Sequence, residues 1–344
     1  MYRFVNDYSE GCHEEILKAL AASNREQTEG YGFDPYSEEA RAIIRRELKC
    51  DDCDVWFIPG GTQTNMLAVT AALRPWEALV GAETCHPVMH EAGAVEATGH
   101  KVLTVPSDDG KVRPEGIREV LRQHDHAPHM VKPRMVFVSQ ATEIGTVYNK
   151  AELTALHDFC RENDLLLYLD GARLGAALVS EPCDLTLPDL AALCDMFYIG
   201  GTKNGAMLGE ALVILNPELR RNFLTVVKQR GALLAKGRML GIQFSALFRD
   251  GLYYKLAEHA VREGVRMAEG MRRLGVTFQN ESPTNQQFII LPETVADRLM
   301  QDYLLDVEDR RDGKVWLRAC TSWATDPKEV DGFLKTLELC LKEA

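Results

Sequence analysis

The stretch Leu165-Leu-Leu-Tyr-Leu-Asp-Gly-Ala-Arg173 decides the fold. Its first five residues are almost entirely apolar, which is typical of a strand buried on both faces of a parallel sheet. Asp170 follows this run directly, and a carboxylate at the end of a buried strand is desolvated and needs a cationic partner. One interpretation is a local pair of Asp170 and Arg173 that caps a helix. The other is a functional carboxylate at the edge of the sheet.

Further apolar runs lie on both sides of this stretch, separated by helical patterns. We predict other strands at 55–58, 78–81, 101–105, 134–139, 196–199 and 211–215. We predict helices at 66–73, 88–98, 114–123 and 150–163. Strands that alternate with helices indicate βαβ units. The fold class is therefore α/β, with a mainly parallel central sheet and helices on both faces.

The pattern of predicted elements changes after Pro217. Long helical patterns cover 219–247 and 252–274, and short strands follow at 276–279, 287–291 and 315–320, with a closing helix at 327–342. This pattern favours a smaller α+β domain at the C-terminus. We therefore predict a large domain with its N-terminal segment over residues 1–247 and a small domain over residues 248–344.

Composition excludes several classes of protein. The net charge of −12 argues against a nucleic-acid partner, which needs clustered positive charge. No apolar run is long enough to span a membrane, and the N-terminus has no secretory signal, so we expect a cytoplasmic protein without a membrane partner. The nine cysteines are odd in number and scattered, which favours reduced thiols. Neither the Cys50/Cys53 pair nor the histidines at 124, 126 and 129 has the partners of a metal site, and we expect none.

Three loops follow the predicted strands at 55–58, 165–169 and 196–199. Gly60, Gly61 and Thr62 precede a helix, whose free N–H groups suit a phosphate, although such a turn is also common as plain structure. Lys203 lies in the glycine-rich turn 200–205, where a merely exposed lysine is the alternative. Because the carboxyl ends of parallel strands meet at one edge, we expect these groups and Asp170 to share a cleft. A phosphate cradle, a carboxylate and a lysine are what pyridoxal 5′-phosphate requires.

The chain resembles the fold-type I pyridoxal-phosphate enzymes of the threonine aldolase and β-eliminating lyase group. The likeness extends over nearly the whole chain, from Asn6 to Trp323. It rests on four motifs: Tyr31-Gly-Phe-Asp-Pro35, Pro59-Gly-Gly-Thr-Gln-Thr-Asn65, Cys85-His86 and Asp170-Gly-Ala-Arg173. The resemblance implies a lyase that cleaves β-hydroxy-α-amino acids, such as threonine, allo-threonine or phenylserine, to glycine and an aldehyde. It also implies a homodimer or homotetramer with shared active sites.

The resemblance implies a role for each matching residue. Lys203 would form the Schiff base, Asp170 would pair with the pyridinium, Arg173 would contact the phenolate side and His86 would stack on the ring. Gly61, Thr62 and Gln63 would hold the phosphate, and Thr202 would also contact the cofactor. Arg318 would bind the substrate carboxylate, and Ser9 and Tyr31 would form walls of the site, with Tyr31 reaching a neighbouring subunit. Lys236 and Arg238 either touch the phosphate across a subunit boundary or lie on a solvated helix face.

Two departures distinguish this chain from many members of the group. Glu143 stands where an active-site histidine is common, and the lysine segment reads Gly-Gly-Thr-Lys-Asn-Gly. Both features resemble a phenylserine-aldolase-like sub-branch. We expect His86 to act as the main base and Glu143 to assist it. Two alternatives stay open: β-elimination from serine-, cysteine- or tryptophan-like substrates, and a non-catalytic binding protein with the same fold.

Overall fold

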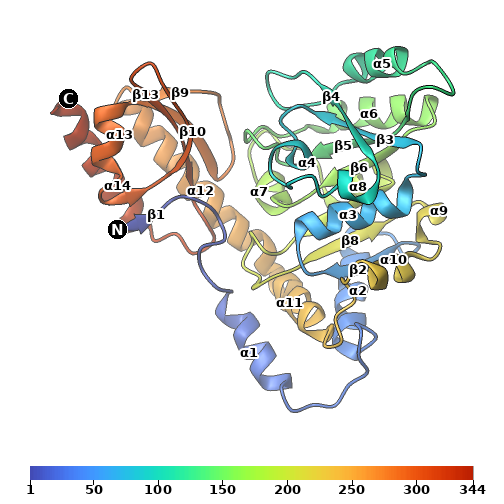
Figure 1. Ribbon diagram of the computed structural model, residues 1–344. Helices are drawn as coiled ribbons and strands as arrows, with labels where there is room; N and C mark the ends of the chain where they lie inside the picture. The colour runs from blue at the N-terminus through green and yellow to red at the C-terminus, as the bar shows by residue number, and fades with distance from the viewer. Residues whose placement is uncertain (344) are drawn as a thin grey trace.

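The computed structural model describes residues 1–343, and a seven-stranded sheet forms its larger part (Figure 1). The strands lie in the order β2-β8-β7-β6-β5-β3-β4. They span Asp54–Ile58 (β2), Glu77–Ala82 (β3), Lys101–Val105 (β4), Lys132–Ser139 (β5), Leu166–Asp170 (β6), Met196–Gly200 (β7) and Glu210–Ile214 (β8). Strand β8 is antiparallel to both of its neighbours, and the other pairings are parallel. The prediction of a mainly parallel sheet is confirmed.

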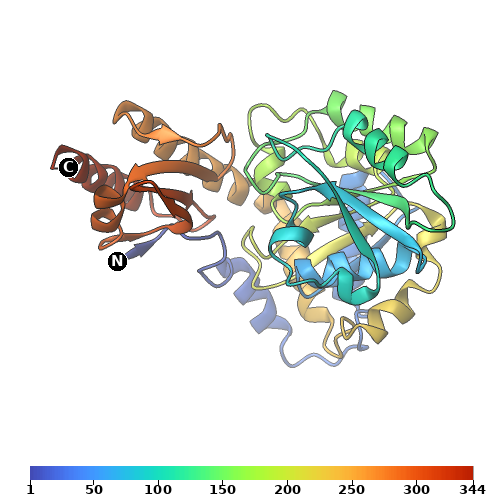
Figure 2. The ribbon, with the colours of Figure 1, turned by 45° about the horizontal axis from the view of Figure 1, so that its top comes forward.

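Helices cover both faces of this sheet, as the alternating pattern predicts. In Figure 2 the green helices α5 and α6 lie on one side of the sheet and the light-blue helix α3 lies on the other. The helices of this part span Pro35–Leu48 (α2), Gly61–Ala72 (α3), Pro114–Gln123 (α5), Lys150–Glu162 (α6), Leu174–Leu178 (α7), Leu187–Leu193 (α8), Pro217–Arg220 (α9), Phe223–Gln229 (α10) and Arg238–Phe248 (α11). All five residues of β6 are buried, which matches their apolar composition.

Two of the predicted helices are wrong as continuous elements. The segment 88–98 holds a short helix, α4 (His86–Met89), and a 3₁₀ turn, η1 (Glu96–Thr98). Between them Ala92 and Gly93 have φ angles of 51° and 74°, a left-handed conformation that no helix continues through. The segment 219–247 is likewise divided into α9, α10 and α11, with Gly231 at a φ of 72°.

A four-stranded antiparallel sheet, in the order β12-β13-β10-β9, forms the smaller part. Its strands span Thr277–Phe278 (β9), Gln286–Pro292 (β10), Asp306–Arg311 (β12) and Lys314–Cys320 (β13). The helices here are α12 (Leu252–Arg273), which follows the short turn η2 (Arg249–Gly251), α13 (Glu293–Leu299) and α14 (Pro327–Lys342). Figure 1 shows α12 running from the larger part to the smaller one. The division at residue 247 stays a prediction.

The N-terminal segment connects both parts of the molecule. Strand β1 (Tyr2–Arg3) pairs with β11 (Tyr303–Leu304), and Phe4 is buried in the C-terminal core. The first residues, assigned above to the large domain, thus pack on the smaller part. The chain then returns through α1 (Glu14–Ser23) to α2, which Asp34 caps. None of the helices over residues 1–343 has the length and apolar character to cross a membrane.

Candidate active site

The ends of β2, β6 and β7 meet at one edge of the larger sheet, beside the start of β8. A cavity of about 290 Å³ opens at this edge. Seven residues named in the sequence analysis line it: Gly60, Gly61, Thr62, His86, Asp170, Thr202 and Lys203. Tyr8, Tyr198 and Glu210 also line it, and nothing in the sequence analysis indicated them. The structure therefore brings the three predicted loops together.

The N-terminus of α3 faces this cavity. Gly60 precedes the helix without a side-chain cap, and the first helical hydrogen bond runs from the Thr64 amide to the Gly60 carbonyl. The amides of Gly61, Thr62 and Gln63 therefore have no acceptor within the helix, and α3 is twelve residues long. Oriented N–H groups and the positive end of a helix dipole favour an anion here.

The Asp170 carboxylate is buried and accepts three hydrogen bonds. The Tyr198 hydroxyl donates one of 2.6 Å, the Ala172 amide one of 2.9 Å and the Asn65 amide group one of 3.1 Å. Burial, and then the nearby charge of Asp170, raise the pKa of Tyr198, so this hydroxyl stays a donor at neutral pH. The three donors fix the position of the carboxylate at the cavity wall.

Lys203 and Glu210 both line the cavity. No carboxylate among residues 1–343 lies within ion-pair distance of the Lys203 ammonium, whose nearest aromatic contact is the Tyr8 ring at 6.0 Å. Glu210 is buried and accepts hydrogen bonds from the Thr202 hydroxyl at 2.8 Å and the Gly201 amide at 2.9 Å. Burial raises the pKa of Glu210 to about 7. The Thr202 hydroxyl is thus occupied with holding the loop that carries Lys203.

His86 meets a second buried carboxylate. Its Nδ1 lies 2.8 Å from Oε1 of Glu91, whose side chain is completely buried. Burial lowers the pKa of His86, but the hydrogen bond to Glu91 and the charges of Glu143 and Asp170 outweigh it, so the pKa is raised. No local pattern in the sequence marks Glu91, because it follows His86 by five residues, a spacing that does not place two side chains on one helix face.

Arg173 does not pair with Asp170. It forms a bidentate ion pair with Asp7, in which Nε lies 2.7 Å from Oδ2 and a terminal guanidinium nitrogen lies 3.1 Å from Oδ1. Both side chains are buried. Asn285 donates a third hydrogen bond to Asp7 at 3.0 Å. Burial raises the pKa of Asp7, but the charges of Arg173 and Lys203 outweigh it and lower the pKa to about 2. The local capping pair considered above is therefore wrong.

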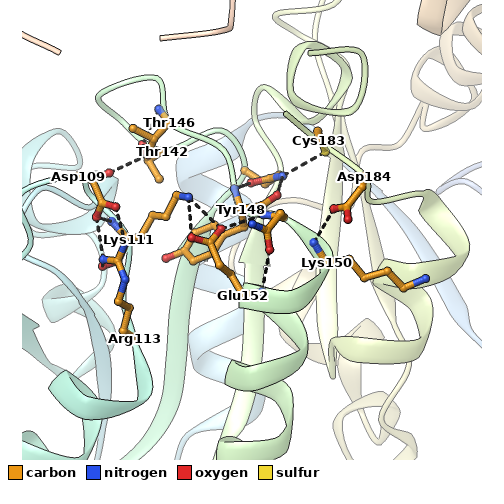
Figure 3. Close-up of polar contacts among 12 residues, drawn as sticks. Asp109, Lys111, Arg113, Thr142, Thr146, Tyr148, Lys150, Glu152, Cys183 and Asp184 are labelled. Carbon is orange, nitrogen blue, oxygen red and sulfur yellow. Dashed lines mark hydrogen bonds and ion pairs between the residues drawn. The ribbon is translucent and has the colours of Figure 1, made fainter. Parts of the chain in front are cut away.

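Arg318 and Glu143 approach the site from outside the cavity lining. Arg318 lies on β13, where its guanidinium binds Asp306 across the strand pair and its Nε is buried without a hydrogen-bond partner among residues 1–343. Glu143 lies in the loop after β5. That loop is held by the Thr142–Thr146 hydroxyl contact of 2.7 Å and by a 2.7 Å bond from Thr146 to the Asp109 carbonyl (Figure 3).

The remaining predicted residues are engaged elsewhere in this subunit. The Gln63 side chain donates to the Arg230 carbonyl at 3.0 Å, and the Ser9 hydroxyl donates to Asn6 at 3.0 Å. Tyr31 is exposed, with the Lys228 ammonium 4.8 Å from the centre of its ring. Their roles at the site stay predictions. Arg238 donates to the Glu26 carbonyl at 2.7 Å.

Comparison with known proteins identifies the family. A family model described as beta-eliminating lyase matches residues 6–294. A low specificity L-threonine aldolase of Pseudomonas aeruginosa is 34% identical over 302 residues, which is 86% of each chain. The chain belongs to the β-eliminating lyase family. A second low specificity L-threonine aldolase, from a Pseudomonas species, is 36% identical over 75% of each chain.

Solved structures agree with this assignment. A threonine aldolase of Leishmania major is 46% identical and superposes with a TM-score of 0.98, over 99% of this chain and 100% of the other. An aspartate aminotransferase of Thermus thermophilus, at 17% identity and a TM-score of 0.74, shares the fold alone. The expected fold-type I architecture and the expected family are both confirmed.

The residues of the cavity fit the pyridoxal phosphate that this β-eliminating lyase requires. The unpaired amides at the start of α3 suit its phosphate, and the buried, threefold hydrogen-bonded Asp170 suits its ring nitrogen. The Lys203 ammonium stands in the same cavity without an ion-pair partner among the described residues. With the cofactor bound, a carboxylate at this position would keep the ring nitrogen protonated, and the lysine would supply the amine for covalent attachment.

Proposed function

We propose that this protein is an aldolase that cleaves β-hydroxy-α-amino acids to glycine and an aldehyde. The observation that carries the proposal is the joint presence of Lys203, Asp170 and His86 around one cavity at an anion-binding helix end. The two Pseudomonas relatives and the Leishmania structure, all named threonine aldolases, support this choice of reaction. Pyridoxal phosphate, when bound, accepts the electrons of the bond that breaks beside the substrate amine.

The proposal gives each residue a distinct task. Lys203 anchors the cofactor, Asp170 holds a proton on its ring nitrogen, and the start of α3 binds its phosphate. Arg318 binds the substrate carboxylate, because a guanidinium can donate two parallel hydrogen bonds to a carboxylate. His86 takes the proton of the β-hydroxyl group, and Glu143 assists it from the loop after β5.

An assay of products tests the proposal directly. The purified enzyme is incubated with threonine or phenylserine, and glycine plus aldehyde is measured against ammonia plus the 2-oxo acid, which is 2-oxobutyrate from threonine and phenylpyruvate from phenylserine. We expect glycine and aldehyde in equal amounts. Ammonia and the 2-oxo acid as the main products would instead establish β-elimination, and no turnover with a bound cofactor would favour a binding protein.

A separate experiment tests whether His86 or Glu143 is the main base. Loss of a general base typically lowers turnover by about 10² to 10⁴-fold. We expect His86→Asn to lose activity in that range and Glu143→Gln to lose much less. A larger loss in Glu143→Gln would assign the base to Glu143.

We also propose that the enzyme is a cytoplasmic homodimer or homotetramer. Tyr31, Leu224 and Met239 are large apolar side chains exposed in the single subunit, and Tyr31 and Leu224 line one shallow apolar hollow. Such a patch is typical of a surface covered by another chain. Sedimentation of the purified protein measures the number of subunits, and a monomer at micromolar concentration would contradict the proposal.

A further inference from the structure

Glu91 is a completely buried carboxylate beside the cavity that no step proposed above uses. It lies in the loop after α4 and does not line the cavity itself. Its Oε1 accepts a hydrogen bond of 2.6 Å from the Asn65 amide group and lies 2.8 Å from Nδ1 of His86. Its Oε2 is buried without a partner among residues 1–343. A buried acid with an unpaired oxygen costs stability, which calls for a functional explanation.

The orientation of Asn65 follows from its own contacts. The Tyr168 hydroxyl donates a hydrogen bond of 2.8 Å to Asn65 Oδ1, so Nδ2 faces the two carboxylates. Nδ2 donates to Glu91 at 2.6 Å and to Asp170 at 3.1 Å. With the amide turned around, its oxygen would face both carboxylates and repel them. Asn65 therefore fixes Glu91 and Asp170 relative to each other.

This arrangement determines which nitrogen of His86 carries a proton. A carboxylate only accepts hydrogen bonds, so Nδ1 is the protonated nitrogen beside Glu91 and Nε2 is the nitrogen left free. His86 lines the cavity together with Lys203 and Asp170. Five charged or titratable groups surround the imidazole. His90 and Glu91 directly follow α4, which carries His86. Glu143 lies after β5, Asp170 at the end of β6 and Lys203 across the cavity.

We propose that Glu91 is a positioning residue that holds the His86 ring by Nδ1 and presents Nε2 to the substrate as the base. The inference rests on the proposed function, in which His86 takes the proton of the β-hydroxyl group. It adds to that function an oriented pair of Glu91 and His86, and it explains why Glu91 is buried. A purely structural Glu91 would fill the same space but leave the protonation of His86 unaffected.

Nuclear magnetic resonance of the cofactor-loaded enzyme tests the inference without measuring activity. The protein is labelled with ¹⁵N in its histidine rings, and the His86 signals are assigned by their loss in His86→Asn. We expect the neutral His86 ring in the wild-type enzyme to carry its proton on Nδ1. A proton on Nε2 would overturn the proposal, and this result needs no Glu91 variant to fold.

Two variants test whether the charge of Glu91 raises the pKa of His86. We expect Glu91→Gln to shift the pKa of His86 downward, because the negative charge at Nδ1 is removed. Glu96→Gln, five residues further on and exposed, is the matched control and should leave the His86 titration unchanged. An unchanged His86 pKa in a folded Glu91→Gln enzyme would overturn the proposal.

Kinetics separate this inference from the proposed function. We expect Glu91→Gln to lose about tenfold or more in kcat, with the acidic limb of its pH profile moved to lower pH, because a weaker base contributes less. We expect Glu91→Asp to recover part of the loss. If the wild-type enzyme shows the Nδ1-protonated ring but forms no glycine, the proposed function fails while the positioning of His86 stands. If it forms glycine with the Nε2-protonated ring, only the positioning role fails.

Discussion

Tyr198 donates a 2.6 Å hydrogen bond to Asp170 from the neighbouring strand of the sheet. The contact joins β7 to β6 at the cavity, and the same hydroxyl lies beside Gly61 at the start of α3. One phenol thus connects the carboxylate proposed for the cofactor ring with the helix proposed for its phosphate.

Removal of this hydroxyl should weaken both stability and cofactor binding. We expect Tyr198→Phe to lower the free energy of unfolding by about 1–3 kcal/mol, because a hydrogen bond to a charged group is lost in the interior. Cofactor affinity should fall several-fold, measured by absorbance on titrating the cofactor-free protein. Tyr36→Phe, which removes an exposed hydroxyl on α2, is the control. Equal cofactor affinity in both variants would contradict this role of Tyr198.

Gly61 and Gly60 form a matched pair of glycines. A Cβ on Gly61 would lie 3.2 Å from the Tyr198 hydroxyl, whereas a Cβ on Gly60 meets nothing within 4 Å. Gly60 has a φ of −166°, an extended conformation open to any residue. We expect Gly61→Ala to displace Tyr198, which would weaken cofactor binding several-fold and lower the free energy of unfolding of the cofactor-free protein, whereas Gly60→Ala should leave that free energy unchanged. Equal free energies of unfolding for the two cofactor-free variants would show that the close contact has no effect on the site.

The buried ion pair of Asp7 and Arg173 should make stability sensitive to acid. The pKa of Asp7 is about 2 in the folded protein, against 3.8 for an unperturbed aspartate. A lowered pKa stabilises the folded state above pH 3.8, and this contribution disappears as the pH falls towards 2. We expect Asp7→Asn to cost about 3–5 kcal/mol near pH 7, because Arg173 stays buried without its partner.

Denaturant unfolding at several pH values measures this effect. The difference between the wild-type protein and Asp7→Asn should be constant above about pH 5 and shrink below pH 4. Glu119→Gln, in an exposed ion pair with Arg122, is the control and should unfold like the wild type. A difference that does not change with pH would mean that Asp7 keeps an ordinary pKa.

The stability contributed by Glu210 should depend on pH in the opposite direction to the stability contributed by Asp7. Burial raises its pKa to about 7 from 4.5, so the folded protein binds its proton more tightly than the unfolded chain. The stability from this group is complete below pH 4.5 and is lost as the pH rises through about 7. We expect the cofactor-free wild-type protein to lose stability relative to Glu210→Gln over this window. A constant difference between the two from pH 4.5 to 8 would contradict the raised pKa.

The sequence predicted the sheet and the cavity better than it predicted the partners of each charge. Strand β6 was identified because a buried parallel strand is apolar throughout, and Asp170 because it ends that strand. The pairing of Arg173 with Asp7 was not predictable, since 166 residues separate them and no local pattern connects them. Glu91, Asn65 and Glu210 were missed for the same reason, because tertiary contacts define their roles.

The break between α4 and η1 had a weak signal in the sequence. Gly93 lies inside the predicted helix 88–98, and a glycine there is compatible with a helix as well as with its end. The long segment 219–247 contains Gly231 and Gly237 in the same way. Local patterns therefore predict the strands of the larger sheet but not β12 of the smaller one, and they leave open where these helices end.

The most direct test of the central claim is a reduction of the purified enzyme with borohydride, followed by mass spectrometry of its peptides. The account predicts a visible absorption band that disappears on reduction, with the mass of reduced pyridoxal phosphate added at Lys203. It also predicts that Lys203→Ala neither gains this mass nor turns over substrate. An adduct at another lysine, such as Lys236, or none in an active enzyme, would contradict the account.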